Sequence, residues 1–406
     1  MSVYTELGVT PIINLWGTAT RLGGALMDEQ VVDAMVQAAR ESVLMEELQA
    51  AASTIIAELT GAEAGYITCG AASGLTLGTA ACLAGLDVSR MERLPDTSGM
   101  PDEVIMARDQ RCGYDHAIRA AGAKIVEVGY NESLTGALRP VETWEFEAAI
   151  TEKTAAIALI FYVWNPAKER QLIEVAKMAK KHNLPVLVDA AGSVPPIDNL
   201  KRFVNAGADL VAFSGGKAIR GPQNTGILCG RRDLIASVAL QQLDAAGPSE
   251  LWNPPKTLIP KEKLIGQPRQ GIARAHKVSK EALVGLLVRL KHLTKERTVD
   301  EAKHMEGLLE RISNAVEGLP VQTAIICRAS EGTGAVPTLK ITLKQEQLGR
   351  DAFTISKELR DGNPRLWVNE KDLRDNTLLI TAINLDEKLA DIVGARLREV
   401  FSLPRG

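Results

Sequence analysis

The sequence predicts an α/β fold with a mostly parallel central sheet and a smaller C-terminal α+β domain. Between residue 28 and about residue 240, segments with helical spacing of apolar residues alternate with short runs rich in valine, isoleucine and alanine. This alternation is typical of βα units wound around a parallel sheet. The length of 406 residues favours more than one domain, and the 46% apolar and 24% charged residues are ordinary for a globular protein.

The elements of the larger domain are expected in the following order. Asp28 is the expected N-cap of a helix that passes through Val31 and Met35, and residues 44–59 continue with helical spacing up to Gly61. Short apolar runs after these helices suit buried parallel strands. The expected strands are 64–68, 104–107, 124–128, 155–161, 185–189 and 209–213.

The C-terminal part is expected to begin after a segment with little regular structure. Residues 241–269 are rich in proline, glycine and polar side chains, which indicates a linker or an active-site loop. A long helix is expected over 279–315 as the connection between domains. The small domain then has expected strands at 322–328, 338–343, 365–368 and 377–382 and helices near 348–360 and 386–401. The expected division is 1–27, 28–268 and 269–406.

Composition excludes several classes of function. The 47 Lys and Arg residues nearly balance 50 Asp and Glu, and aromatic residues make up 4%, so a nucleic-acid partner is not expected. No apolar run is long enough for a membrane span, and the N-terminus has no basic and apolar leader pattern. The five scattered cysteines have no zinc-type spacing, so we expect reduced thiols, no metal site and a cytoplasmic protein.

Lys217 is the most informative residue. It follows the apolar run 209–213 and a Ser214-Gly215-Gly216 turn. A lysine that is partly desolvated at a strand end can present a neutral amine as a Schiff-base nucleophile, and the glycines allow main chain to approach a ligand. An exposed turn lysine is the other interpretation and would be favoured for this residue alone.

Asp189 supports the functional interpretation of Lys217. It ends the apolar run Val186-Leu187-Val188, and ligands of open α/β sheets bind at the carboxyl ends of the strands. Asp189 and Lys217 are therefore expected to share a cleft, in which an acidic group could partner the ring nitrogen of pyridoxal phosphate (PLP). A helix-capping aspartate is an equally good interpretation when Asp189 is considered alone.

A phosphate site is expected upstream. The small residues Gly70, Ala71, Ala72 and Ser73 follow the strand 64–68 and precede an apolar helix, so main-chain N–H groups at a helix N-terminus can bind phosphate there. Close packing explains small residues equally well. The Ser214 hydroxyl is a further candidate for the same phosphate, although a turn serine needs no ligand.

Taken together, these residues resemble the fold-type-I PLP enzymes, and among them the selenocysteine-synthase-like group that includes D-glucosaminate-6-phosphate ammonia lyase. The resemblance covers nearly the whole chain. It depends on Ile13-Asn14 followed by Gly17-Thr18, the Gly70 turn, Asp189, the run Phe213–Lys217 continuing into Gly221-Pro222-Gln223, and the segment Ala273–Lys280. It implies PLP as cofactor, Lys217 as Schiff-base lysine, Asp189 as partner of the pyridine nitrogen and Gly70 to Ser73 as the phosphate cup.

The resemblance also suggests further site residues. His116 or Tyr114 lies where such folds place a residue stacked on the cofactor ring, although a histidine on a helix surface is an equally good interpretation of His116. Asn14, Thr18 and Arg21 belong to an N-terminal segment, 1–27, that is expected over the active site and could contact the substrate. A loop with only a structural role would have a similar sequence.

Two arginines are candidates for a substrate anion, and two features depart from the group. Arg274 and Arg365 offer paired donors to a carboxylate or phosphate, but an ordinary salt bridge is equally compatible with each. The chain reaches Asn14 without the N-terminal tRNA-binding region of bacterial selenocysteine synthases, so a tRNA substrate is not expected. The expected arginine directly before Thr377 is absent.

The expected activity is that of a PLP-dependent lyase on a small polar or phosphorylated amino acid. Lys217 would remove the α-proton, β-elimination would follow, and ammonia and a 2-oxo acid would be released. Racemisation, transamination and aldol-type cleavage share the early steps, and no residue selects among them. A non-catalytic or tRNA-related binding protein on the same fold is the alternative from another class. The resemblance further implies a homodimer or a larger homo-oligomer.

Overall fold

A computed structural model describes residues 2–130, 139–161, 165–244, 247–327 and 336–402. The chain divides into two compact units. The large unit consists of Met27–Val194 and Asp198–His292, and the small unit consists of Met1–Leu26, Pro195–Ile197 and Leu293–Gly406. Within the described residues, no helix is both long enough and apolar enough to cross a bilayer.

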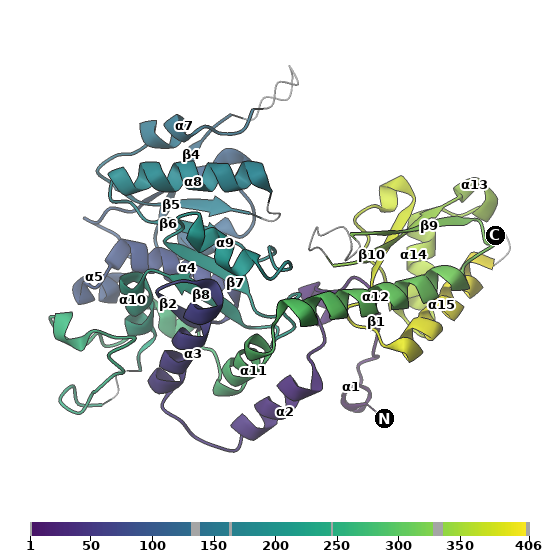
Figure 1. The fold of residues 1–406 in the computed structure, drawn as a ribbon, viewed down its shortest axis with the longest axis horizontal. Coiled ribbons are helices and arrows are strands. Elements are labelled where there is room, and N and C mark those ends of the chain that lie inside the picture. The colour runs from purple at the N-terminus through teal and green to yellow at the C-terminus, as the bar shows by residue number, and fades with distance from the viewer. Residues whose placement is uncertain (1, 131–138, 162–164, 245–246, 328–335, 403–406) are drawn as a thin grey trace. The chain divides into compact units, whose positions relative to one another are not determined.

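The large unit is built on a seven-stranded sheet (Figure 1), with the order β2-β8-β7-β6-β5-β3-β4 among the described residues. Only β8 runs antiparallel to its neighbours in this sheet. Its strands are β2 (Ala64–Thr68), β3 (Glu103–Ala107), β4 (Lys124–Val128), β5 (Thr154–Ile160), β6 (Val186–Asp189), β7 (Leu210–Ser214) and β8 (Gly226–Gly230). This sheet confirms the predicted α/β fold with a mostly parallel sheet.

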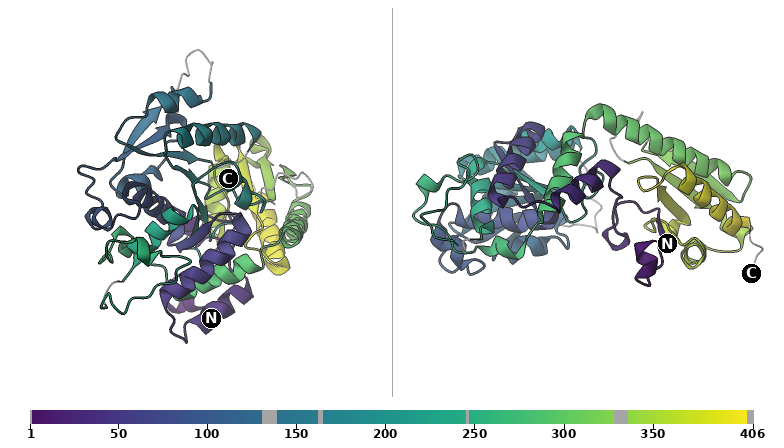
Figure 2. Two further views of the ribbon diagram at one scale, coloured as in Figure 1. Left: turned by 60° about the vertical axis from the view of Figure 1, so that its left-hand side comes forward. Right: turned by 90° about the horizontal axis from the view of Figure 1, so that it is seen from below.

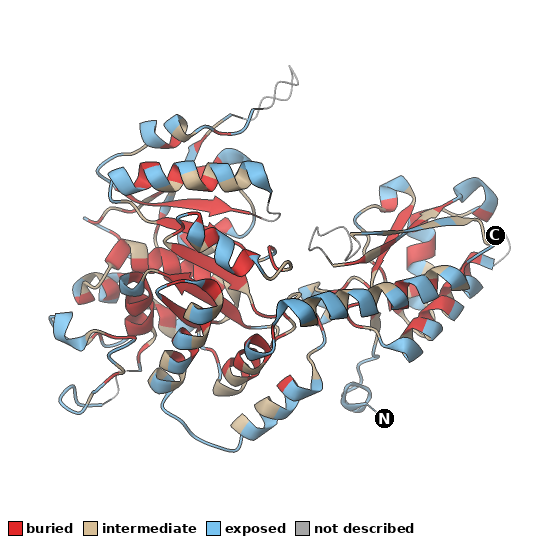
Figure 3. Cartoon of the chain, in the orientation of Figure 1, coloured by how far each residue is buried: buried red, intermediate tan, exposed pale blue. Residues whose placement is uncertain are grey.

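Helices cover the sheet of the large unit, and its central strands are buried (Figure 3). The connection from β5 shows how sequence sets a helix start: the Asn165 side chain accepts a hydrogen bond from the Lys168 N–H (3.0 Å), and Pro166 occupies the first helical turn. The helices are α2 (Glu29–Ala38), α3 (Met45–Thr60), α4 (Gly70–Ala84), α5 (Val88–Arg93), α6 (Asp115–Ala120), α7 (Thr143–Ala148), α8 (Pro166–Lys181), α9 (Asn199–Asn205), α10 (Arg232–Gln242) and α11 (Lys280–Lys291).

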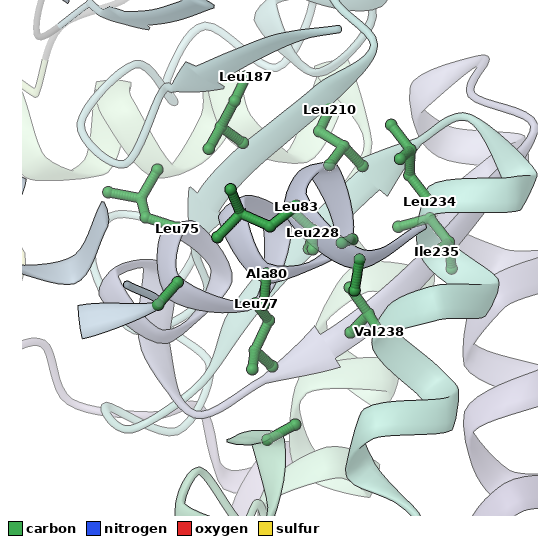
Figure 4. Close-up of a cluster of buried hydrophobic side chains, with 14 of the residues drawn as sticks. Leu75, Leu77, Ala80, Leu83, Leu187, Leu210, Leu228, Leu234, Ile235 and Val238 are labelled. Atoms are coloured by element: carbon green, nitrogen blue, oxygen red, sulfur yellow. The ribbon is translucent and has the colours of Figure 1, made fainter. Parts of the chain in front are cut away.

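Helix α4 packs directly against the sheet and forms the centre of the core. Leucines of α4 pack against leucines of β6, β7 and β8, and apolar side chains of α10 complete the cluster (Figure 4). Gly78 permits this close approach, because a Cβ there would already lie 3.0 Å from Leu187 and 3.4 Å from Leu210. The N-terminus of α4 is therefore fixed against the strands that carry the candidate site.

The small unit contains a three-stranded antiparallel sheet in the order β12-β10-β9, with α12 and α15 side by side (Figure 2). A parallel pair, β1 (Ile13–Asn14) and β11 (Leu366–Trp367), joins the N-terminal segment to this unit. The remaining elements are α1 (Val3–Glu6), α12 (Lys295–Ala315), β9 (Val321–Ile326), β10 (Thr338–Leu343), α13 (Gln345–Leu348), α14 (Ala352–Asp361), β12 (Thr377–Thr381) and α15 (Glu387–Ser402). Of the expected strand 322–328, Arg328 lies outside the described residues.

The prediction of one long helix over 279–315 is wrong. The chain forms α11 and then α12, because the Thr294 side chain accepts a hydrogen bond from the Arg297 N–H (3.2 Å) and starts a new helix. Helix α11 also lies in the large unit, where Gly285 contacts Met35 and Pro222. The units therefore divide after His292, whereas the expected domain boundary lay at 268.

Asp28 stands at the N-cap position of α2 as expected, but its carboxylate does not cap the helix. It forms ion pairs with Arg220 and Arg289 instead. The strand β8 was missed in the sequence.

Candidate functional site

Two parallel strands of the large unit deliver Asp189 and Lys217 to the same edge of the sheet. Asp189 is the last residue of β6, and it pairs in register with Ala212 of β7. Strand β7 continues to Ser214, and the turn that follows carries Lys217. The carboxyl ends of neighbouring parallel strands meet at one edge of a sheet, so Asp189 and the Lys217 turn lie at the same edge, as expected.

Asp189 is a buried carboxyl group. Its side chain is only 4% exposed, and the Ala191 N–H donates to Oδ1 at 2.9 Å. Burial raises the pKa of Asp189, while the hydrogen bond from Ala191 and the positive charge of Lys217 oppose that rise. The native fold therefore maintains a carboxyl group whose charged form is poorly solvated and whose electrostatic partner is Lys217.

Lys217 is partly buried. Burial lowers the pKa of its amine, and the negative charge of Asp189 acts in the opposite direction. A larger share of the amine is consequently neutral near pH 7 than in an exposed lysine. The neutral amine is the form that a nucleophilic lysine requires.

The two positions before Lys217 must be glycine for steric reasons. A Cβ on Gly216 would lie 2.5 Å from the main chain of Gln223, and a Cβ on Gly215 would lie 2.3 Å from the Thr225 hydroxyl. The outgoing chain is held close by hydrogen bonds from the Gly215 N–H to Thr225 O (2.9 Å) and from the Gly221 N–H to Gly215 O (2.9 Å). The Ser-Gly-Gly pattern thus serves a tight turn that presents Lys217.

The N-terminus of α4 is the predicted phosphate cup. Helix α4 starts at Gly70, whose φ of 84° favours glycine, and no side chain among the described residues caps its first turn. The Ser73 hydroxyl is buried and has no hydrogen-bond partner within the described residues. Free first-turn N–H groups and a buried hydroxyl without a partner at a helix N-terminus are suited to an anion.

Strand register links this cup to the lysine turn. Ser214 of β7 pairs with Gly226 of β8, and Gly226 pairs with Thr68 at the end of β2, two residues before Gly70. Two strand spacings, about 10 Å in all, therefore separate Ser214 from Thr68. Gly226 was not predicted as a site residue, yet a Cβ there would lie 2.4 Å from the main-chain carbon of Gly70.

The predicted ring-stacking residues lie on and before α6. The Thr76 hydroxyl donates to Ala117 O at 2.9 Å, which places α6 beside the first half of α4. His116 and Tyr114 are exposed, and the His116 Nδ1 is 3.0 Å from the Arg119 Nη2. A stacking role for either residue stays a prediction.

Arg274 already has partners within the large unit. It lies in the 3₁₀ helix η4 (Ile272–Ala275), where Nη2 pairs with Asp244 Oδ2 at 3.1 Å and Nη1 donates to Gln242 O at 3.3 Å. The structure thus realises the salt-bridge alternative for this arginine.

Asn14 organises the N-terminal segment of the small unit. Its Oδ1 accepts from the Trp16 and Gly17 N–H groups (3.0 and 3.1 Å), and its Nδ2 donates to Gly17 O and Gly24 O (2.9 and 3.1 Å). Both polar atoms are fully used by main chain. Asn14 therefore holds the 14–24 loop, and its contact with a substrate stays a prediction.

Arg21 in the same loop is stacked on aromatic rings. Its guanidinium carbon lies 5.6 Å from the Trp16 ring centroid and 4.9 Å from that of Trp367. Stacking leaves the in-plane N–H donors available. The Arg365 Nε donates to Arg360 O (3.0 Å), and Thr18 is partly buried. The contact between Arg21 and Trp367 was missed because the two residues are distant in sequence.

Comparison with known proteins supports the resemblance. A family model described as SelA, L-seryl-tRNA selenium transferase, matches residues 12–247. The chain is 30% identical to 5'-C-glycyluridine monooxygenase-decarboxylase of a Streptomyces species, across 98% of this chain and 92% of the relative. It is 29% identical to D-glucosaminate-6-phosphate ammonia lyase of Salmonella typhimurium, across 98% of both.

Solved structures agree with these relationships. A structure of D-glucosaminate-6-phosphate ammonia lyase matches with a TM-score of 0.78 and 27% identity over 98% of both chains. More distant fold-type-I PLP enzymes share the fold. The predicted fold-type-I architecture is confirmed, and the chain is an enzyme that belongs to the SelA family.

Proposed function

We propose that this enzyme depends on PLP and holds the cofactor covalently on Lys217. The observation that carries the proposal is the placement of a partly buried lysine and a buried carboxyl group at the same carboxyl edge of β6 and β7. Burial lowers the pKa of Lys217 and raises the pKa of Asp189, so neither group is in its preferred environment without a ligand.

The residues at this edge fit the parts of PLP. The first turn of α4 from Gly70 to Ser73, with the Ser73 hydroxyl that has no other partner within the described residues, would hold the phosphate. Ser214 would add a hydroxyl, and Asp189 would pair with the ring nitrogen. When bound, PLP supplies an electron sink for charge that develops at the substrate α-carbon.

Lys217 has two functions in this proposal. Its amine would hold the cofactor and, when free, would take the proton from the substrate α-carbon. A pKa lowered by burial supports the second function, because a general base works best when its pKa is close to the working pH. Asp189 as a carboxylate would pair with the ring nitrogen of a bound cofactor and favour its protonated form.

The proposed reaction is elimination with release of ammonia and a 2-oxo acid from a small polar or phosphorylated amino acid. It is supported by full-length similarity to D-glucosaminate-6-phosphate ammonia lyase. Arg21 is our first candidate for an anionic group of the substrate, because its stacked guanidinium keeps its donors available. Arg365, Thr18 and Arg274 are weaker candidates. A homodimer or larger homo-oligomer is also proposed.

Trapping the cofactor tests the central claim. The purified protein is incubated with PLP, reduced with borohydride and digested, and the modified peptide is identified by mass spectrometry. We expect the adduct on Lys217 and its loss in Lys217→Ala. Lys201→Ala, which removes an exposed lysine of α9, is the matched control and should behave like wild type. An adduct on another lysine, or none, contradicts the proposal.

A substrate panel tests the reaction. Amino acids and phosphorylated amino-sugar acids are incubated with the PLP-loaded enzyme while ammonia, 2-oxo acid and chirality are followed. Inversion without ammonia would indicate a racemase, and transfer of the amino group a transaminase. Because the monooxygenase-decarboxylase relative is equally similar, oxygen uptake and CO₂ release are measured too. Either one without ammonia would refute the lyase proposal.

A further inference from the structure

A partly buried ion network lies against the turn that carries Lys217. Arg289 of α11 is 1% exposed, and its Nε donates to the main-chain oxygen of Ile219 at 2.6 Å. Its Nη1 donates to Asp28 Oδ2 at 2.8 Å. The other oxygen of Asp28 pairs with Arg220 Nη2 at 3.0 Å. Arg289 of α11 is therefore linked to two consecutive residues of the turn, to Ile219 directly and to Arg220 through the Asp28 carboxylate.

The main chain of this turn is strained where the network binds it. Arg220 has a φ of 63°, a left-handed conformation that is unfavourable for a residue with a side chain. The same residue closes the turn, because its N–H donates to Lys217 O at 3.0 Å. The ion pair with Asp28 thus holds a strained residue that is hydrogen-bonded directly to Lys217.

Helix α11 also contacts both ends of the turn. A Cβ on Gly221 would lie 2.7 Å from the Leu286 side chain, and a Cβ on Gly215 would lie 3.0 Å from it. Leu286 and Arg289 are one turn apart on α11. The turn is therefore held by one apolar contact and one hydrogen-bonded guanidinium from the same helix.

An apolar side chain at position 289 would fill the space without the cost of burying a charge. It could not, however, donate to the Ile219 carbonyl or pair with Asp28. We propose that Arg289 and Asp28 are positioning residues that fix the Lys217 turn, and with it the amine of Lys217 relative to Asp189. This inference rests on the proposed function of Lys217 and assigns the network no direct contact with substrate.

The expected consequence of removing the network is a change at the Lys217 amine. Without the bonds to Ile219 and Arg220, the strained turn relaxes and the amine gains solvent. Since burial is the main cause of the lowered pKa of Lys217, that pKa should rise toward its ordinary value. A purely structural role would lower the melting temperature and leave the titration of Lys217 unchanged.

The experiment measures Lys217 in the protein without PLP. Trace acetylation at a series of pH values, read by peptide mass spectrometry, gives the pKa of the amine, with Lys201 as the internal reference. Arg289→Gln and Asp28→Asn are compared with Phe146→Leu, which disturbs the buried core on α7 away from the turn. We expect the two network variants to raise the Lys217 pKa by at least about half a unit, a threefold loss of neutral amine. The control should leave it unchanged.

The proposal is overturned if both network variants melt at lower temperature but the pKa of Lys217 in them is the same as in the Phe146→Leu control. If Arg289→Gln does not fold, Asp28→Asn decides, because it keeps the shape of the side chain and removes its charge. Failure of the proposed function is recognised separately: wild-type Lys217 would then form no borohydride-trapped adduct, whereas the acetylation measurement uses no cofactor.

Discussion

Gly226→Ala should damage the phosphate cup from a neighbouring strand. The new Cβ would lie 2.4 Å from the main-chain carbon of Gly70 and 2.6 Å from the Ala71 nitrogen, about 1 Å closer than an ordinary contact. Both neighbours are main-chain atoms, so no change of rotamer relieves the overlap. The start of α4 must move by a comparable distance. We expect a loss of about 1–3 kcal/mol in stability from overpacking.

The cofactor reports the same displacement. Loss of one hydrogen bond to a charged phosphate costs about 1.5–3 kcal/mol, so PLP should bind about 10- to 100-fold more weakly. The assay is a PLP titration followed by visible absorbance, with thermal unfolding of the protein without PLP in parallel. Gly74→Ala is the matched control, because its Cβ would meet Ala212 and the Thr68 hydroxyl at an ordinary 3.4 Å. Equal PLP affinity in the two variants would refute the assignment of the cup.

Three further predictions concern single side chains. Ser73→Ala should weaken PLP binding by about tenfold and raise the stability of the protein without PLP slightly, because it removes a buried hydroxyl that has no partner in the described part of the chain; unchanged affinity would contradict the cup. Asp189→Asn should stabilise the protein without PLP by about 1 kcal/mol at neutral pH, measured by urea unfolding. Burial raises the pKa of Asp189, so the native state keeps a proton that the unfolded chain has lost, and wild-type stability falls as pH rises from about 4 through the folded pKa. The gain should therefore be absent at low pH, and an equal gain at all pH values would be inconsistent with this reasoning. Asn14→Ala should destabilise the protein by about 2–4 kcal/mol, since the Trp16 and Gly17 N–H groups lose their acceptor and the Gly17 and Gly24 carbonyls keep only the Asn384 amide as donor; a variant as stable as wild type would contradict this structural role.

The central part of the site was predictable from local sequence. Apolar runs that end in Asp189 and in the Ser-Gly-Gly turn before Lys217 predict parallel strands, and parallel strands bring their carboxyl ends together whatever the rest of the chain does. The Gly70 turn follows the same rule, since a strand that ends before an apolar helix places N–H groups at that edge. These inferences needed only the direction and burial of each strand.

Features that depend on distant pairing were not predictable in this way. An arginine on a helix is normally expected to be exposed. Arg289 is buried because it pairs with Asp28, and local sequence does not reveal that partner, which is 261 positions away. Gly226 begins a short strand whose place between β2 and β7 is set by sheet order, which hydrophobic spacing does not reveal. The break before α12 did leave a local signal: Thr294 followed by Glu296 is a typical helix start.

The groups gathered at the carboxyl edge of the sheet share one energetic property. The poorly solvated Asp189, the partly desolvated Lys217 amine and the Ser73 hydroxyl, which has no partner among the described residues, each make the protein less stable when no ligand is bound. The apolar packing of α4 on β6, β7 and β8 offsets these costs without contributing to chemistry. A ligand that gives partners to these groups must therefore stabilise the fold. Asp189→Asn and Ser73→Ala should each raise the stability of the protein without PLP while reducing the increment that PLP adds. A gain in stability without PLP that is accompanied by a smaller stabilisation by PLP distinguishes a binding site from an ordinary packing defect. Repair of a packing defect would leave the stabilisation by PLP unchanged.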